Sequence, residues 1–342
     1  MKIILTIIGI LLCTRTFAQF PQYDLKSNGL HGVVSSVETL KRDYKVEFGE
    51  YTKSDSWVVN TQVFDSKGLL VCEQYRYVAG SKDFEDERRF REPIYKSAPV
   101  NYEGVGGSTP TLKLDSLYRF YHYNSNAQIT TINTYKSDGT LFFLDEFVYQ
   151  DNKIKEHNIY KWGNDLTFKT TYKYEAENQV TVKKYGTDGH QTDYGTTYTI
   201  VNGDVVKEQT IYTTRYTYQN HLMMSRAGSK DHQTVYAYDK WGNMTKKGEK
   251  VYNYNTKQFQ LNDRETVRWK YTYDQQGNWI WKCKYSGKWN EETTEDLSNT
   301  PASERTIQYG DSEADVDVIA NRYLQKEQDL IAQYKKEHSQ GE

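Results

Sequence analysis

The chain has 342 residues, with 44 lysines and arginines, 46 aspartates and glutamates, and a formal net charge of −2. This balance gives neither the basic footprint of a nucleic-acid-binding protein nor a basic patch for a membrane surface. Three cysteines exclude a disulfide-dense scaffold, and 31 tyrosines make tyrosine the compositional outlier. Because tyrosine favours half-buried strand surfaces, this composition indicates β-structure rather than disorder.

Residues 1–18 have the pattern of a secretory signal peptide. A lysine near the start precedes an apolar run over 3–13, and the small Ala18 allows cleavage before Gln19. We therefore expect the mature protein to be secreted, periplasmic or held at the cell surface. The apolar run is too short to span a bilayer, and no later stretch has about eighteen consecutive apolar residues, so the sequence predicts no transmembrane segment.

Residues 19–310 alternate between short segments of strand character and turn signals, at spacings of roughly 10 to 20 residues. Several of these segments contain a Tyr-x-Tyr pair, and the two-residue period places both rings of a pair on one face of a strand. The pairs are Tyr121/Tyr123, Tyr172/Tyr174, Tyr216/Tyr218, Tyr236/Tyr238, Tyr252/Tyr254 and Tyr271/Tyr273. This pattern predicts a mainly β domain of tandem antiparallel β-hairpin repeats.

Two kinds of turn separate the predicted strands. Segments 65–68, 239–242 and 274–277 each have Asp first and Gly fourth, as in a type I turn that ends in a glycine with positive φ. The second kind consists of two-residue hairpin signals, namely Asp138-Gly139, Asp188-Gly189 and Asn202-Gly203. Alternation of the two kinds predicts a meander of hairpins.

The turn at 274–277 also predicts a register for the hairpin around it. The predicted opposite pairs are Tyr273 with Trp279, Tyr271 with Trp281, and Trp269 with Cys283. Such an aromatic ladder is a candidate ligand platform, because exposed rings stack against sugars. The same rings also stabilise a thin sheet through cross-strand contacts, so a purely structural role is the alternative.

Residues 80–115 interrupt the repeat pattern. They hold a charge cluster over 83–91, prolines at positions 93 and 99, and a glycine-rich run over 104–108. These residue types disfavour strands, so the segment is expected to form an inserted loop or lid.

Residues 311–342 are expected to form a C-terminal amphipathic helix, over about 311–338, and a polar tail. Ser312 and Asp315 have the spacing of a capping box at the helix start. One face carries the apolar residues Val316, Ile319, Tyr323, Leu330, Ile331 and Tyr334. An apolar face needs a surface to cover, and a thin repeat array requires a cap, so we expect the helix to cover the aromatic ladder.

Two segments match a known repeat motif. Residues 236–243 read Tyr-Ala-Tyr-Asp-Lys-Trp-Gly-Asn, and residues 271–278 read Tyr-Thr-Tyr-Asp-Gln-Gln-Gly-Asn. They resemble the YD repeat of the RHS family, Tyr-x-Tyr-Asp-x-x-Gly, and looser copies extend the resemblance over most of residues 60–285. The resemblance implies a small secreted YD-repeat protein, in which surface-associated β-repeats spiral into open sheets with roles in carbohydrate binding, adhesion or encasing a toxin. Asn243 and Asn278 stand where the repeat often has Arg, so only the architecture and the surface location are carried over.

The sequence shows no motif of a catalytic or metal site. It lacks the Gly-x-Ser-x-Gly, His-Glu-x-x-His and phosphate-binding glycine motifs and a Cys-x-x-Cys pair. No histidines have paired-ligand spacing, and the Asp-x-x-Gly turns lack the dense carboxylates of a calcium loop. Asp145 and Glu146 are adjacent and would point to opposite faces of a strand, which disfavours a glycosidase pair. We therefore predict no catalytic residue, cofactor or metal.

These observations favour a non-catalytic binding or structural module, with a carbohydrate or another envelope protein as its partner and no role in nucleic-acid binding. The alternative is an enzyme whose site is assembled from distant residues under the 80–115 segment, which convergent titratable side chains in a pocket there would favour. Cys72 and Cys283 form either one long-range disulfide or two separately buried thiols.

Overall fold

The computed structural model describes residues 23–25, 28–47, 50–53, 58–76, 116–161, 165–176, 178–193, 195–202, 204–289 and 301–338. The predicted signal peptide at 1–18 and the predicted insertion at 80–115 lie outside the described residues. In the part of the chain that is described, no helix has the length and apolarity needed to cross a bilayer.

The described residues are mainly in β-strands, as predicted. Strands β1 to β9 span Val34–Glu47, Glu50–Lys53, Val58–Phe64, Leu70–Arg76, Ser116–Tyr123, Ile129–Lys136, Leu141–Gln150, Lys153–Lys161 and Asp165–Ala176. Strands β10 to β19 span Gln179–Tyr185, Thr196–Val201, Asp204–Gln209, Thr213–Gln219, Leu222–Ala227, His232–Tyr238, Met244–Asn253, Gln258–Tyr273, Trp279–Ser286 and Pro301–Tyr309. Helix α2 spans Glu313–His338.

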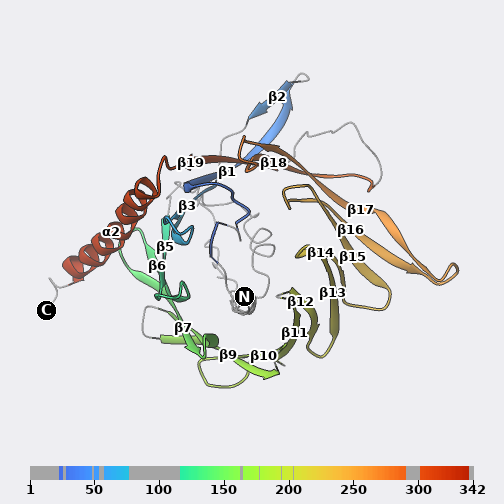
Figure 1. Ribbon diagram of the computed structural model, residues 1–342, viewed down its shortest axis with the longest axis horizontal. Helices are drawn as coiled ribbons and strands as arrows, with labels where there is room; N and C mark the ends of the chain where they lie inside the picture. The colour runs from blue at the N-terminus through green and yellow to red at the C-terminus, as the bar shows by residue number, and fades with distance from the viewer. Residues whose placement is uncertain are drawn as a thin grey trace, which may run out of the picture.

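Strand pairing closes the sheet into a barrel (Figure 1). From β3 to β19 each strand pairs antiparallel with the next strand in the chain, and β1 pairs with both β3 and β19. The β1–β19 ladder runs from Val34 opposite Tyr309 to Asp43 opposite Pro301, and β2 forms a projecting hairpin with the far end of β1. The hairpin meander is confirmed, but the open sheet is wrong. Closure pairs the two edges that an open array would leave exposed.

The position of helix α2 shows which face of the sheet is the outer face of the barrel. It lies outside the ring, against β1, β3 and β4 (Figure 1). The outward-facing residues beneath it, which include Val63, Cys72 and Phe120, form an apolar cluster with the helix. The residues that alternate with these point inward and form a larger apolar cluster, which includes Phe64 and Tyr121.

Most Tyr-x-Tyr pairs lie on the inner face. Those within or against the inner apolar cluster are Tyr121, Tyr123, Tyr172 and Tyr174. The strand register carries the same face onward through Tyr216/Tyr218, Tyr236/Tyr238 and Tyr271/Tyr273. The Tyr252/Tyr254 pair differs, because the β15–β16 register turns Glu249 inward and so places Tyr252 on the outer face, near the end of the β16–β17 hairpin. The tyrosine-rich composition therefore builds the inner wall of the barrel.

Helix α2 begins near the predicted residue but covers a different surface. The Asp315 N–H donates to Ser312 Oγ at 3.3 Å, and the Ser312 hydroxyl donates to Asp315 Oδ2 at 2.8 Å, which caps the helix start. Val316 and Leu330 on the predicted apolar face are buried. The helix packs on β1, β3 and β4 instead of the hairpin at 269–281. The expectation that it covers the aromatic ladder is therefore wrong.

Polar side chains explain why α2 docks where it does. Glu327 is 2 % exposed, its Oε1 accepts a hydrogen bond from Asn133 Nδ2 at 2.8 Å, and His122 Nε2 lies 3.1 Å from its Oε2. Lys326 Nζ donates to the Tyr118 hydroxyl at 2.9 Å. These partners face outward on β5 and β6, beside the apolar cluster. The apolar periodicity of the helix shows that it needs a surface, but not which strands carry matching polar partners.

Cys72 and Cys283 are both buried free thiols in the structure. Cys72 lies on β4 in the apolar cluster beneath α2, and burial raises the pKa of its thiol. Cys283 lies on β18. Of the two alternatives, the structure has the separate thiols.

Candidate functional site

The predicted aromatic ladder is correct for its first pair only. Tyr273 lies opposite Trp279 as expected, but a β-bulge at Ile280 then places Trp281 opposite Thr272. As a result, Tyr271 faces Lys282 and Trp269 faces Lys284. One extra residue in a strand moves every later side chain to the other face. The candidate platform is therefore split between the two faces. Trp269, Tyr271, Tyr273 and Trp279 point inward, whereas Trp281 points outward.

The ring of Trp279 is enclosed by other side chains. It is 5 % exposed, with the guanidinium carbon of Arg305 3.6 Å and Lys282 Nζ 5.0 Å from its ring centre. The Tyr271 ring adds an edge contact at 6.4 Å. Cations over an aromatic face stabilise the packing of the wall. Trp279 thus offers no open face for stacking against a ligand.

Tyrosine hydroxyls bond to backbone carbonyls at the bulges that follow the turns. Tyr123 donates to the carbonyl of Leu70, Tyr238 to that of Met223 and Tyr271 to that of Met244, each at 2.8 Å. Each carbonyl belongs to the residue directly before a bulge. A bulge disrupts the local ladder, so a hydroxyl from the following hairpin supplies the missing donor.

A second contact explains the Asp of the repeat motif. Asp239 Oδ1 accepts hydrogen bonds from two N–H groups of its own turn, and its Oδ2 accepts one from the Tyr273 hydroxyl of the next hairpin. Asp274 Oδ1 likewise accepts hydrogen bonds from two N–H groups of its own turn, and its Oδ2 accepts one from the Tyr309 hydroxyl on β19. The carboxylate therefore closes one turn and joins two successive hairpins. Sequence reasoning assigned it the first role only.

Asn278 joins the segment before β1 and the end of β19 to the β17–β18 hairpin. Asn278→Ala should lower the free energy of unfolding by about 1–3 kcal/mol, because it leaves buried polar groups without partners. The residue is fully buried. Its Oδ1 accepts from the His31 N–H at 2.6 Å, and its Nδ2 donates to the His31 carbonyl at 2.9 Å and to the Tyr309 hydroxyl at 2.6 Å.

The matched control for this substitution is Asn243→Ala, measured with it by urea denaturation. Asn243 occupies the equivalent position but is half-buried, and its Nδ2 lies 3.3 Å from the Tyr273 hydroxyl. It should lose clearly less stability than Asn278→Ala. Equal losses would contradict the role of Asn278 in joining His31 and Tyr309 to the β17–β18 turn.

Exposed large apolar side chains lie on several turns at one end of the barrel. The turns β12–β13, β14–β15 and β16–β17 lie at the same end, because each joins an even-numbered strand to the next strand of an antiparallel meander. The large exposed residues there, which we call the aromatic rim, are Ile211 (61 % exposed), Tyr212 (73 %), Tyr254 (69 %) and Phe259 (40 %). The Tyr254 hydroxyl donates to Asp231, which links two of the turns, and Phe259 packs against the Tyr252 ring at 5.3 Å.

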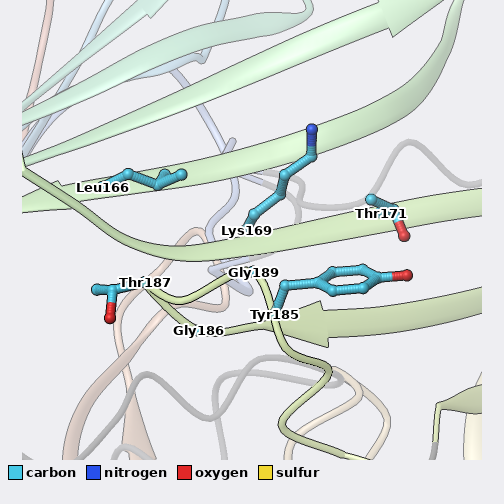
Figure 2. A pocket seen from close by; sticks show the side chains of 7 residues that line it. All are labelled: Leu166, Lys169, Thr171, Tyr185, Gly186, Thr187 and Gly189. Carbon is cyan, nitrogen blue, oxygen red and sulfur yellow. The ribbon is translucent and has the colours of Figure 1, made fainter.

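A shallow hollow lies beside the neighbouring turn of the same end, β10–β11, on the outer face (Figure 2). Its volume is about 210 Å³. It is lined by Leu166, Lys169, Thr171, Tyr185, Gly186, Thr187 and Gly189. The sequence signal nearby was the Asp188-Gly189 turn, which indicates a hairpin but gives no indication of a hollow, since β9 supplies part of its lining.

Glu73 is the centre of a buried polar cluster on the inner face. Its Oε1 accepts a hydrogen bond from Gln62 Nε2 at 2.9 Å, and its Oε2 accepts from the hydroxyls of Tyr75, at 2.9 Å, and Tyr121. Arg119 Nη1 lies 3.9 Å from Oε2. Burial raises the pKa of Tyr121, which keeps this donor protonated. The carboxylate is thus stabilised by several donors, as a buried charge requires.

A second buried pair joins Asp145 and His157. Asp145 Oδ1 lies 2.7 Å from His157 Nε2, and the His157 ring stacks on Phe147 at 4.3 Å. Glu146 points to the opposite face, toward Asn158. The predicted separation of Asp145 and Glu146 is therefore confirmed. Over the described ranges, no group of three or more His, Cys, Asp or Glu side chains is placed to hold a metal ion.

Comparison with known proteins gave no match to a protein-family model or to a curated protein. Among solved structures, the chain is similar to a porin-like protein from Bacteroides uniformis, with 10% identity over 80% of this chain and 98% of that chain and a TM-score of 0.37. It is also similar to a protein of unknown function from Bacteroides fragilis, with 11% identity over 35% of this chain and 88% of that chain and a TM-score of 0.19. A third similarity is to the TcdB2-TccC3-Cdc42 complex, with 10% identity over 80% of this chain, 18% of that chain and a TM-score of 0.24. Similarities of this size assign no family, so the likeness to YD repeats stays an interpretation of the motif.

Proposed function

We propose that this protein is a non-catalytic binding module of the secreted or cell-envelope compartment, and that its aromatic rim binds carbohydrate. The observation that carries the proposal is the exposure of Tyr212, Tyr254 and Phe259 on the turns of a closed sheet. Burial of such rings would stabilise the fold, and clustered exposed apolar groups mark interaction sites. The proposed compartment rests on the signal-peptide pattern at 1–18.

The polar groups around the rim favour a ligand rich in hydroxyl groups. Asp231 supplies a carboxylate that already accepts the Tyr254 hydroxyl. On the opposite face of the β16–β17 hairpin from Phe259, Asn253 and Gln260 supply amides, and the Asn253 Nδ2 donates to Gln260 Oε1 at 2.9 Å. Rings bind the apolar face of a sugar, and carboxylates and amides bind its hydroxyls. A protein partner would use the same rings and is the second candidate ligand.

The enzyme alternative gains no support from the residues beside the 80–115 segment. Strands β4 and β5 flank that segment, and their inward-facing titratable groups include Glu73 and Arg119. Both carboxylate oxygens of Glu73 already accept hydrogen bonds from the protein. A catalytic carboxylate needs access to a substrate, so we assign this cluster a role in stability.

A glycan array with the purified protein tests the proposal. Binding to at least one class of glycan is expected, and the double variant Tyr254→Ala/Phe259→Ala should weaken it by about tenfold or more, as expected from the loss of two stacking contacts. The control is Val318→Ala, an exposed apolar residue on α2. An absence of glycan binding, or binding that the double variant leaves unchanged, would overturn the proposal.

A further inference from the structure

The hollow on the outer face combines an aromatic wall with a cation. Tyr185 and Lys169 lie directly opposite each other on β10 and β9, so their side chains are neighbours on one face (Figure 2). Thr171 follows Lys169 on that face and adds a hydroxyl. Gly189 leaves one side open, because a Cβ built on it would meet no atom within 4 Å. A sugar ring can therefore approach the Tyr185 ring from solvent.

Two lysines offer ammonium groups to an anionic ligand at the hollow, next to the carboxylates of Glu156 and Asp188. The Lys169 ammonium lies 3.0 Å from Glu156 Oε2 on β8, so it reaches toward the strand on the other side of β9 from Tyr185. An ammonium has three N–H donors, so this ion pair leaves donors for a ligand. Lys183, which lies opposite Thr171, is exposed and adds a second positive charge on the same face. A carboxylate matches this arrangement, because charge-assisted hydrogen bonds to ammonium groups are the stronger kind.

The hollow lies at the same end of the barrel as the aromatic rim. Its turn, β10–β11, lies at the same end of the barrel as β12–β13, which carries Tyr212, and β16–β17, which carries Tyr254. Neighbouring strands are about 4.8 Å apart, so successive turns at this end lie about 10 Å apart. Tyr185, Tyr212 and Tyr254 belong to the first, second and fourth of these turns, so an extended polymer that reaches all three must span about 30 Å.

From this arrangement we infer that the hollow binds a carboxylate-bearing sugar unit of an acidic polysaccharide whose chain continues along the aromatic rim. Lys169 pairs with the carboxylate, and Tyr185 stacks against the sugar ring. The rim residues then bind the following units, so that the separate contacts combine into one stronger interaction. This inference rests on the proposed carbohydrate-binding function and names its ligand class.

Isothermal titration of the full mature chain with oligogalacturonates and neutral malto-oligosaccharides tests the inference. The acidic oligomers should bind more tightly than neutral ones of equal length, and Lys169→Gln should reduce affinity for them by about tenfold or more. Tyr185→Ala should weaken binding, whereas Tyr185→Phe should bind as the unmodified protein does, because it keeps the ring. Lys173→Gln is the matched control, since this lysine lies on the outer face of the same strand and is 79% exposed. Melting temperatures of all variants verify that each is folded.

Oligomer length separates this inference from the proposed function. The affinity for trigalacturonate should depend on Lys169 and not on Tyr254. A long oligogalacturonate should bind more tightly than trigalacturonate, and the variant Tyr254→Ala should lose this gain in affinity. Equal affinity for acidic and neutral oligomers, or insensitivity to Lys169→Gln, would overturn the inference and leave the proposed function standing. An absence of binding to any oligosaccharide would overturn both.

Discussion

Gly277→Val is expected to lower the free energy of unfolding by about 3 kcal/mol or more, through backbone strain and overpacking together. Gly277 has a φ of +87°, which confirms the conformation predicted from its turn and which a β-branched residue strongly disfavours. Strain alone costs about 1–3 kcal/mol. A Cβ at this position would also lie 2.6 Å from the Trp241 ring of the preceding turn, so that ring must move.

Gly189→Val separates these two contributions in the same urea-denaturation measurement. Gly189 also has a positive φ, +73°, but a Cβ there meets no atom within 4 Å. The variant Gly189→Val should therefore lose only the free energy of unfolding that backbone strain costs, because no ring has to move. Equal losses in both variants would contradict the packing of Trp241 on the turn, and an unchanged melting temperature for Gly277→Val would contradict the turn conformation itself.

The folded protein is expected to lose stability steeply as the pH rises from 10 to 12. Burial raises the pKa of Tyr198, Tyr218 and Tyr238 from 10 to about 12. A raised pKa means that the folded state favours the neutral phenol, so this stabilisation is complete below pH 10 and is lost as the pH rises through 12. Tyr238 also loses its hydrogen bond to the Met223 carbonyl, because a tyrosinate has no proton to donate.

A pH titration that records tyrosinate absorbance and far-ultraviolet circular dichroism together tests this expectation. Both signals should change in one cooperative transition above pH 10, since ionising the inner wall unfolds the barrel. N-acetyltyrosinamide, measured in parallel, gives the ordinary titration. If all tyrosines titrate like this compound and the circular dichroism stays unchanged, the burial of the inner-wall tyrosines is contradicted.

The turns and the helix could be predicted because their signals are local. The Asp and Gly positions of 274–277 specify a turn, and Ser312 with Asp315 specifies a helix start, from residues a few positions apart. The period of two in the tyrosine pairs likewise predicts that Tyr271 and Tyr273 share a face. Each of these inferences depends only on backbone conformation and residue type.

Features that depend on distant residues could not be predicted in the same way. One bulge at Ile280 reversed the face of Trp281, and no residue type marks such a bulge clearly in the sequence. The pairing of β1 with β19 depends on the accumulated twist and curvature of all the intervening hairpins. The bond from Tyr273 to Asp239 likewise joins two hairpins whose relative placement is known only from the fold. The hollow beside Tyr185 belongs to this class, because two strands and a turn build it.

The closure of the sheet is the central structural claim, and a cross-link between β1 and β19 tests it most directly. Glu38 lies opposite Thr306 in this ladder. Opposite Cα atoms in antiparallel strands are about 4.5–5.5 Å apart, within the range of a disulfide. The variant Glu38→Cys/Thr306→Cys, purified under reducing conditions and then oxidised, should form an intramolecular disulfide that speeds migration on a non-reducing denaturing gel. The control Glu38→Cys/Thr217→Cys, with its second cysteine on β13, should not. Rapid cross-linking of the β1–β19 pair alone is the result expected for a closed barrel, whereas no cross-link, or cross-links only between separate chains, would contradict it.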